Sequence, residues 1–286
     1  MVDEHDERAA MADPERSTEL LWEAKARRGL SLDRIVGAAV ELADAEGLAA
    51  VSMRRLAERL GFTTMALYRH VPGKAELVAL MCDQVHSEPA AGADAEQPHG
   101  WRGALAAWAR DGLELHRRHP WLVESDDARL VPGPHTVARF DRALEIVAGA
   151  GLSPAQVVAS VNLVGGFVNS TARQAAAAER AERRTGVSDE EWWRDRDSLF
   201  AHLDRYPALT RLYQEGAFET PVDPFEFGLE RVLDGVEALV RDEKRDESRC
   251  AVCGAPVEDA PRGRPRGYCS RACQQRAYRI RSGRQR

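Results

Sequence analysis

The chain has 286 residues, enough for two or three folding units, and its 44% hydrophobic and 30% charged content is typical of a globular protein. It contains no run of eighteen apolar residues, and its acidic beginning lacks the apolar segment of a signal peptide. These features exclude a membrane protein and favour a cytoplasmic location. The net charge of −6 is unevenly distributed, because residues 262–286 contain nine arginines and no acid. The remainder carries 31 basic and 46 acidic groups.

The predicted elements begin after an acidic segment, residues 1–30, which we expect to be flexible or loosely helical near residues 20–26. Ser31 is a suitable N-cap for a helix whose apolar residues recur on one face. Gly47 follows this helix, and a glycine in that position usually ends a helix in the left-handed conformation.

Two short helices joined at a glycine come next. Ser52 can cap the first of them, and Gly61 ends it after about two turns. Thr63 or Thr64 can cap the second, which ends before Pro72. This arrangement is typical of a helix-turn-helix, whose second helix enters the major groove of DNA. The segment is basic, with five Lys or Arg against two acids, as phosphate contact requires. An ordinary helical hairpin with a solvated charged face would show the same pattern.

Three sequences within this region, AAVELADAEGLAAVSMRRLAERLG, ALYRHV and GKAEL, resemble the DNA-binding domain of the tetracycline-repressor family of bacterial transcription regulators. The resemblance implies a double-stranded DNA operator as partner. It also implies DNA contacts at nine positions: Ser52, Arg54, Thr64, Met65, Ala66, Tyr68, Arg69, His70 and Lys74. Arg54 and Arg69 are best suited to reading bases, because a guanidinium pairs bidentately with guanine. Tyr68, His70 and Lys74 are expected to hold phosphates.

The rest of the chain up to about residue 245 has helical apolar spacing and no strand pattern. The expected helices are 101–119, 134–150, 154–183, 189–203 and 224–244. HPWL at 119–122 and FEFGLERVLDGVEAL at 225–239 resemble the C-terminal domain of the same family, which implies an effector-binding homodimer. In that architecture the helices 154–183 and 224–244 of two subunits form a four-helix bundle. Dimerisation also supplies two recognition helices for half-sites about one helical turn, roughly 34–36 Å, apart.

The resemblance further implies a pocket for a small-molecule effector in this second domain. The candidate residues are Trp108, His116, Phe140, Asn162, Asn169 and Arg173. For any single one of them, packing in the core or exposure to solvent or to a partner subunit is the commoner role. Asn162, Asn169 and Arg173 are favoured because they interrupt a small and apolar helix. The residues do not identify the effector.

Four of the five cysteines lie in the last 37 residues, as Cys250-x2-Cys253 and Cys269-x3-Cys273. Two close pairs separated by a loop have the spacing of a structural zinc site, in which each pair supplies adjacent corners of a tetrahedron. Free thiols in a disordered tail and disulfides are the alternatives, and a reducing cytoplasm disfavours disulfides. The pattern also resembles short zinc knuckles. Cys82 lies in an apolar stretch and is expected to be a core thiol.

The arginine-rich tail after the knuckle is expected to contact nucleic acid, with docking on the acidic body of the chain or on a partner protein as alternatives. An enzyme is not expected, because the sequence contains no nucleophile elbow, phosphate loop or catalytic metal spacing.

The predicted fold is therefore all-α. It comprises a flexible segment (1–30), a helix-turn-helix domain of three helices (31–78), a helical effector-binding and dimerisation domain (79–245), and a zinc knuckle with a basic tail (246–286). The expected function is that of a homodimeric repressor that a small molecule releases from a palindromic operator. The alternative is an adaptor or activator whose tail recruits a partner or nucleic acid.

Overall fold

The structure is a computed structural model that describes residues 14–22, 30–89, 100–125, 130–194, 202–218, 222–247, 249–250, 252–257 and 268–283. Within these ranges the regular structure is helical, apart from one isolated β-bridge between Arg249 and Pro256. The all-α prediction is confirmed. In the described part of the chain, no helix combines the length and apolar composition needed to cross a bilayer.

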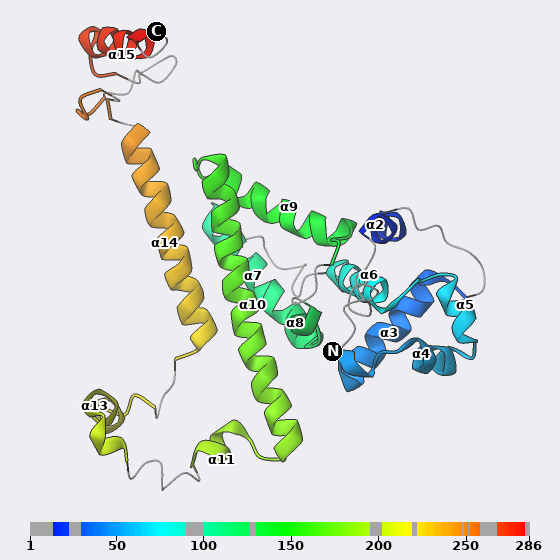
Figure 1. Cartoon of the computed structure of the whole chain (residues 1–286). Coiled ribbons are helices and arrows are strands. Elements are labelled where there is room, and N and C mark those ends of the chain that lie inside the picture. Colours follow the sequence, from blue (N-terminus) through cyan, green and yellow to red (C-terminus); the bar gives the residue numbers. More distant parts are fainter. Residues whose placement is uncertain are drawn as a thin grey trace, which may run out of the picture.

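The helices form an N-terminal unit, a larger body and a C-terminal module (Figure 1). The N-terminal unit contains α2 (Pro14–Trp22), α3 (Leu32–Glu46), the 3-10 turn η1 (Leu48–Ala50), α4 (Met53–Leu60), α5 (Thr64–Tyr68) and α6 (Lys74–His86). The body contains α7 (Gly100–Arg118), α8 (Leu122–Ser125), α9 (Pro134–Ala148), α10 (Pro154–Thr185), α11 (Asp189–Arg194), η2 (Leu203–Arg205), α13 (Pro207–Gln214) and α14 (Pro224–Glu247). The module contains α15 (Arg271–Gly283).

Side-chain caps begin the helices of the N-terminal unit, as the sequence predicts. The hydroxyl groups of Ser31, Ser52 and Thr63 each accept a hydrogen bond from the backbone N–H three residues later, at 3.2–3.3 Å. Gly61 ends α4 in the left-handed conformation with φ 74° and ψ 31°. Gly47 also has a positive φ of 85°, but its ψ of 163° is extended. The chain therefore leaves α3 by a different turn from the left-handed stop expected there.

The N-terminal segment is more ordered than the sequence suggests. Helix α2 begins at Pro14, earlier than the loose helix expected near residues 20–26, and residues 23–26 of that expectation lie outside the described residues. Leu21 is buried in the same apolar cluster as the residues of α6. Burying this side chain supplies the tertiary contact that a short helix needs, because isolated helices of this length are marginal in water.

Two apolar clusters form the core. The first joins the N-terminal unit to the corner between α7 and α8, because Leu115, Trp121 and Leu122 pack among the residues of α3 to α6. The second lies between α7, α9, α10 and α14. Helix α6 is continuous from Lys74 to His86, so the domain boundary expected at residue 78 falls inside a helix. The N-terminal unit and the body therefore share core residues.

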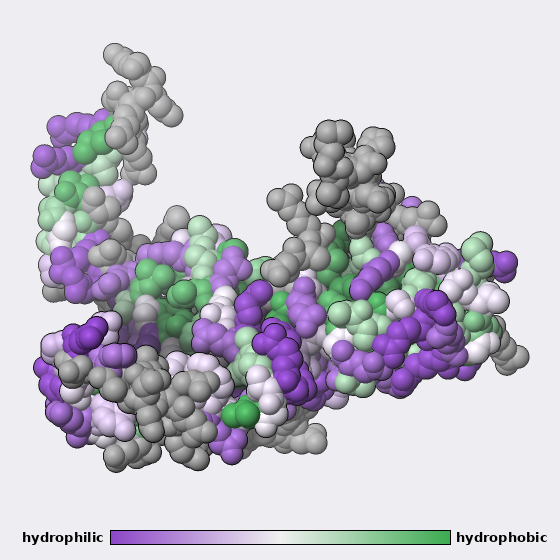
Figure 2. Space-filling model, turned by 60° about the horizontal axis from the view of Figure 1, so that its bottom comes forward, coloured by the Kyte–Doolittle hydropathy of each residue, from purple (hydrophilic) through white to green (hydrophobic). Residues whose placement is uncertain are grey.

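The two long helices α10 and α14 lie side by side in the body (Figure 1). Their closest approach is at Gly228, where an added Cβ would lie 2.5 Å from the ring of Phe167. The sequence missed two short helices, α8 and α13. Of the helix expected at 189–203, α11 covers Asp189–Arg194, and residues 195–201 lie outside the described residues. In Figure 2 hydrophilic side chains cover much of the N-terminal unit, at the right of the view.

Candidate functional site

Helix α5 presents the candidate recognition residues to solvent. Leu67 is fully buried and anchors the helix, while Met65, Tyr68 and Arg69 are exposed. Thr64, Ala66 and His70 are half-buried on the same short element. A helix of this kind, fixed by one apolar residue and open on its outer face, can enter the major groove of DNA. The six candidate residues of α5 and its C-terminal turn are therefore all at least partly accessible to a ligand.

The three remaining candidates flank α5. Ser52 uses its hydroxyl oxygen to cap α4, and it also stands at the start of that helix, where backbone N–H groups favour an anion. Arg54 is highly exposed, and its Nε lies 3.0 Å from Glu58 Oε1 in an exposed ion pair. Lys74 donates from Nζ to the carbonyl oxygen of Leu48 at 3.4 Å, at the first turn of α6.

Ion pairs brace α4 against α3. Arg55 donates to both carboxylate oxygens of Glu46, at 2.9 and 2.7 Å, and this hydrogen bonding lowers the pKa of Glu46. Arg59 pairs with Glu41 at 2.8 Å. These arginines are oriented by acids of α3, whereas no described residue pairs with Arg69. Arg69 is therefore the exposed cation of α5 that is available to a ligand.

A polar contact ties the N-terminal unit to the body at the corner between α7 and α8. Asp44 of α3 uses its Oδ1 to accept a hydrogen bond from Trp121 Nε1 at 2.7 Å, and His119 Nδ1 lies 2.7 Å from the same oxygen. His119 Nε2 is 3.1 Å from Glu88 Oε1, and Arg118 pairs with Glu88. The His119 and Trp121 side chains are buried. The position of α3 is therefore coupled to that of this corner.

A second contact joins α6 to α9. The buried Asp83 accepts a hydrogen bond from the backbone N–H of Thr136 at 2.8 Å and so caps α9 from another helix. Gly133 allows the approach, because a Cβ there would lie 2.3 Å from the Asp83 carboxyl carbon. His86 Nδ1 is 3.1 Å from Thr136 Oγ1. Burial and then the nearby Arg139 lower the pKa of His86 to about 4.

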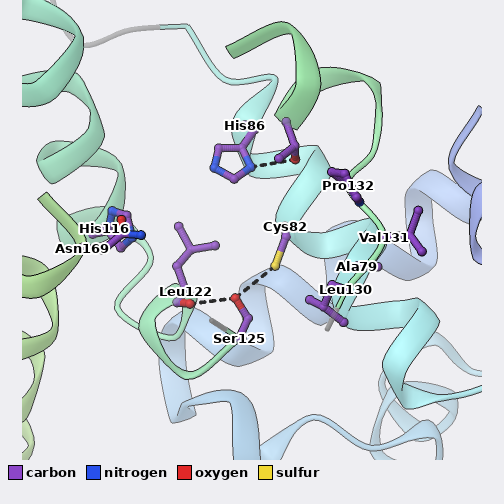
Figure 3. A pocket seen from close by; sticks show the side chains of 11 residues that line it. Ala79, Cys82, His86, His116, Leu122, Ser125, Leu130, Val131, Pro132 and Asn169 are labelled. Atoms are coloured by element: carbon purple, nitrogen blue, oxygen red, sulfur yellow. Dashed lines mark hydrogen bonds between the residues drawn. The ribbon is translucent and has the colours of Figure 1, made fainter. Parts of the chain in front are cut away.

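A cavity of about 310 Å³ lies between these elements. Its lining comes from α6, the corner of α7 and α8, the start of α9, and α10 (Figure 3). The lining residues are Ala79, Cys82, His86, His116, Leu122, Ser125, Leu130, Val131, Pro132, Thr136 and Asn169. Cys82 Sγ lies 3.3 Å from Ser125 Oγ, which donates to the carbonyl oxygen of Leu122 at 2.7 Å. Cys82, expected to be a core thiol, thus lines the cavity.

Of the six candidate pocket residues, the structure brings His116 and Asn169 to this cavity. Trp108 instead donates from Nε1 to the carbonyl oxygen of Arg139, whose guanidinium lies over its ring at 5.5 Å. Phe140 is exposed on α9. Asn162 and Arg173 lie on the exposed face of α10, because Val161, Val164, Val168 and Ala172 fill the opposite face of that helix.

The sequence missed His86, Ser125 and Thr136 as residues of the cavity. They come from α6, α8 and α9, and Thr136 and His86 meet only through tertiary packing. Of these three, only His86 could have been suspected from the sequence, because it is an imidazole at the end of an apolar helix.

The four C-terminal cysteines converge as the spacing predicts. Their sulfur atoms all lie within 4.8 Å of one another. Cys253 Sγ is 3.4 Å from Cys269 Sγ, and Cys273 Sγ is 3.7 Å from each of these two. These distances are far longer than a disulfide bond of about 2.05 Å. Backbone N–H groups, that of Cys269 first, lower the pKa of Cys250 to about 6. Hydrogen bonding with Cys253 raises the pKa of Cys269 to about 12. The four cysteines can therefore hold a metal ion.

Known proteins resemble both parts of the chain. The family model of "Bacterial regulatory proteins, tetR family" matches residues 35–81, and that of the "Tetracyclin repressor-like, C-terminal domain" matches residues 94–240. The HTH-type transcriptional repressor DrrR1 of Streptomyces coeruleorubidus is 42% identical over 251 residues, or 85% of this chain and 92% of that protein. The class C tetracycline repressor of Escherichia coli is 27% identical over 73% of this chain and 92% of its own.

Solved structures show the same fold. The Streptomyces coelicolor protein ActR in complex with actinorhodin matches with a TM-score of 0.60 and 27% identity, over 74% of this chain and 97% of its own. The regulator SCO7222 of the same organism matches with a TM-score of 0.59 and 28% identity, over 74% of this chain and all of its own. The chain belongs to the tetracycline-repressor family of bacterial regulatory proteins and is a ligand-regulated, DNA-binding regulator of transcription, not an enzyme.

Proposed function

We propose that the protein is a homodimeric repressor that binds a palindromic operator through α5 and is released when a small molecule occupies the cavity. The observation that carries this proposal is the exposed outer side of α5, with Arg69 at its C-terminal end paired to no described residue. Arg69 and Arg54 would read base edges, while Tyr68, His70 and Lys74 would hold phosphates. Ser52, Thr64, Met65 and Ala66 complete the proposed DNA surface. Binding bacterial DNA implies a cytoplasmic location.

Apolar side chains left exposed on α10 and α14 support a homodimer. Val158, Leu163 and Phe227 are 43%, 54% and 55% exposed. Gly166 and Gly235, on the same helices, have open space where a side chain would stand. An exposed apolar face with small residues allows close approach of another helix pair. A four-helix interface built from α10 and α14 of two subunits would cover these side chains.

The position of the cavity supports control by a ligand. The cavity touches α6, which belongs to the N-terminal unit, and the corner of α7 and α8, which holds α3 through Asp44. A ligand there can change DNA affinity only if it binds one arrangement of these elements more tightly than the other. His116 and Asn169, together with His86, Ser125 and Thr136, supply polar groups beside the apolar side chains of the lining. The repressor DrrR1 and the actinorhodin complex of ActR are similar proteins, which supports both repression and ligand control.

The metal of the cysteine cluster is proposed to be a structural zinc ion. Zinc–sulfur bonds are about 2.3 Å long, so a tetrahedral site has sulfur–sulfur distances of about 3.8 Å. The distances of 3.4 and 3.7 Å in the cluster fit this geometry. Four thiolates leave no open position for a substrate, which makes the role structural. Zinc would hold the two cysteine pairs together in a module that has little apolar core of its own.

The DNA proposal is tested with the Arg69→Ala variant. Selected operator duplexes and scrambled duplexes are titrated with the dimeric protein while fluorescence anisotropy is recorded. We expect the variant to lose about 1–3 kcal/mol of discrimination per half-site, because one bidentate base contact is removed. Arg184→Ala, an exposed arginine of α10, is the control and should bind as the wild type does. Equal discrimination by Arg69→Ala and the control would contradict the assignment.

The zinc proposal is tested by metal analysis of the purified chain. We expect one zinc per subunit in the wild type and a large loss in Cys269→Ser, because an alcohol is a poor substitute for a thiolate. Cys82→Ser is the control, since Cys82 lies in the cavity away from the cluster. Unchanged zinc content in Cys269→Ser would refute the site.

A further inference from the structure

Helix α15 carries Arg271 and Arg279 on the side away from the cysteine cluster. Cys273 and Ala277 are half-buried, and their spacing of four residues places them on one side of the helix. Arg271, Arg276 and Arg279 are exposed. With 3.6 residues per turn, Arg271 and Arg279 fall on the side opposite Cys273 and Ala277, and Arg276 falls at its edge. The cluster thus fixes one side of α15 and leaves a basic side open.

The three arginines have no ion pair within the residues that the structure describes, unlike many arginines of the body. Arg102 contacts three acids of α14, and Arg110 makes two hydrogen bonds with Glu226. Each of these guanidinium groups serves to hold two helices together. Within the part of the chain that the structure describes, the guanidinium groups of Arg271, Arg276 and Arg279 hold no other element, so this part of the fold does not account for them.

The charge of the region identifies the kind of partner. Residues 262–286 contain nine arginines and no acid, so no acidic residue there neutralises the face. Guanidinium groups on an exposed helix bind phosphate groups, and a polyanion gains affinity by releasing condensed counterions when it binds. DNA is the polyanion that this protein binds in its regulatory function. The chemistry of α15 therefore favours DNA as its partner.

The position of α15 decides which DNA it can reach. Figure 1 places α15 beyond the C-terminal end of α14, and α4 and α5 on the other side of the body. The body stands between the two basic elements. A short duplex seated on α5 therefore lies on the opposite side of the body from the α15 of the same subunit.

We propose that α15 is a second DNA-binding site, which holds a DNA segment separate from the operator through Arg271, Arg276 and Arg279. The contact is to phosphates, which guanidinium groups bind whatever the base sequence of the duplex. One protein dimer would then join two DNA segments. This inference goes beyond operator binding and rests on both the proposed operator contact and the metal-ordered knuckle.

The test measures whether operator-bound protein captures a second duplex. Zinc-loaded full-length protein is bound to an immobilised short operator duplex, and a fluorescent duplex of scrambled sequence is then added at several salt concentrations. We expect the wild type to retain the second duplex, and R271A/R276A/R279A to retain roughly tenfold less. The slope of log affinity against log salt for the second duplex should fall by about 2.7 per subunit, since each phosphate contact contributes about 0.9.

The control variant R142A/R184A/R211A removes the same three charges from exposed positions of the body and should capture the second duplex normally. Equal zinc content shows that both variants keep the knuckle folded. Capture by R271A/R276A/R279A at the wild-type level, or no capture by the wild type, overturns the proposal. Phenylglyoxal modifies accessible arginines. If it fails to modify Arg271, Arg276 and Arg279 in DNA-free protein, the proposal is also overturned, because the helix is then docked on protein. If the wild-type protein does not bind the immobilised operator duplex, the proposed function fails, and the second-site proposal is not what the result contradicts.

Discussion

Replacing Asp44 with alanine should show how strongly the N-terminal unit is held to the body. Asp44 Oδ1 lies 2.7 Å from both Trp121 Nε1 and His119 Nδ1, whose side chains are buried. Leaving a buried donor without an acceptor costs about 1–3 kcal/mol. Trp121 has no other acceptor among the described residues and would bear this full cost. His119 keeps Glu88 at 3.1 Å and would lose less. We expect a total loss of about 2–4 kcal/mol, a large part of a typical stability of about 5–15 kcal/mol.

The loss is measured by urea unfolding at a fixed protein concentration, because a dimer gains stability with concentration. Circular dichroism reports the helices without depending on the tryptophans near the substitution. Asp33→Ala removes an equal charge from an exposed position of the same helix and should cost less than about 1 kcal/mol. Asp44→Asn keeps an acceptor oxygen and should recover more than half of the loss. A midpoint for Asp44→Ala that matches the Asp33→Ala control would refute the reasoning.

Three further substitutions test other parts of the fold. Gly228→Ala should destabilise the body by about 1–3 kcal/mol, because its Cβ would displace the Phe167 ring, whereas Gly149→Ala, at the exposed end of α9, has open space around the new Cβ; equal thermal midpoints would contradict this. Gly61→Ala should lower the free energy of unfolding by about 1 kcal/mol, because a non-glycine residue is strained at the φ of 74° found there. An unchanged urea midpoint would count against that strain. Neutral His86 contributes stability that is complete above pH 6.5 and is lost as the pH falls toward 4, by about 2 kcal/mol at pH 5. The His86→Gln variant should lose less stability between pH 6.5 and pH 5 than the wild type does. Identical stability–pH profiles for the two proteins would exclude a contribution from His86.

Local signals in the sequence were enough to predict the short helices of the helix-turn-helix, whereas the motif itself was identified by the family resemblance. Ser31, Ser52 and Thr63 cap helices by accepting hydrogen bonds from backbone N–H groups three residues later. Such contacts depend only on nearby residues, so the sequence alone indicates them. The cysteine cluster could be predicted equally well, because the spacing of the cysteines within each pair is typical of metal-binding sites. The DNA contacts of α5 rest on family resemblance and stay a prediction, although the structure leaves those residues at least partly exposed.

The cavity could not be predicted in the same way. Ser125 belongs to a helix of four residues, too short to show a period, and Thr136 meets His86 from a distance of fifty residues. Trp108 has a polar group that a neighbouring carbonyl satisfies, and sequence alone does not show which indoles find such a partner. Such contacts exist only once α6, α8 and α9 have packed, so no local pattern records them.

The capping of α9 by Asp83 sets a rule for building hybrid regulators from this chain. Asp83 belongs to a helix that begins in the N-terminal unit, while the amide it binds and the close Gly133 belong to the body. A graft that ends at residue 78 would join half of α6 from one parent to half from another. A junction at Pro72–Gly73 keeps Asp83 with its own α9 and moves α4 and α5 together, while Lys74 stays with the body. Such a hybrid also needs an aspartate at the place of Asp44, or Trp121 would face an imported helix without an acceptor.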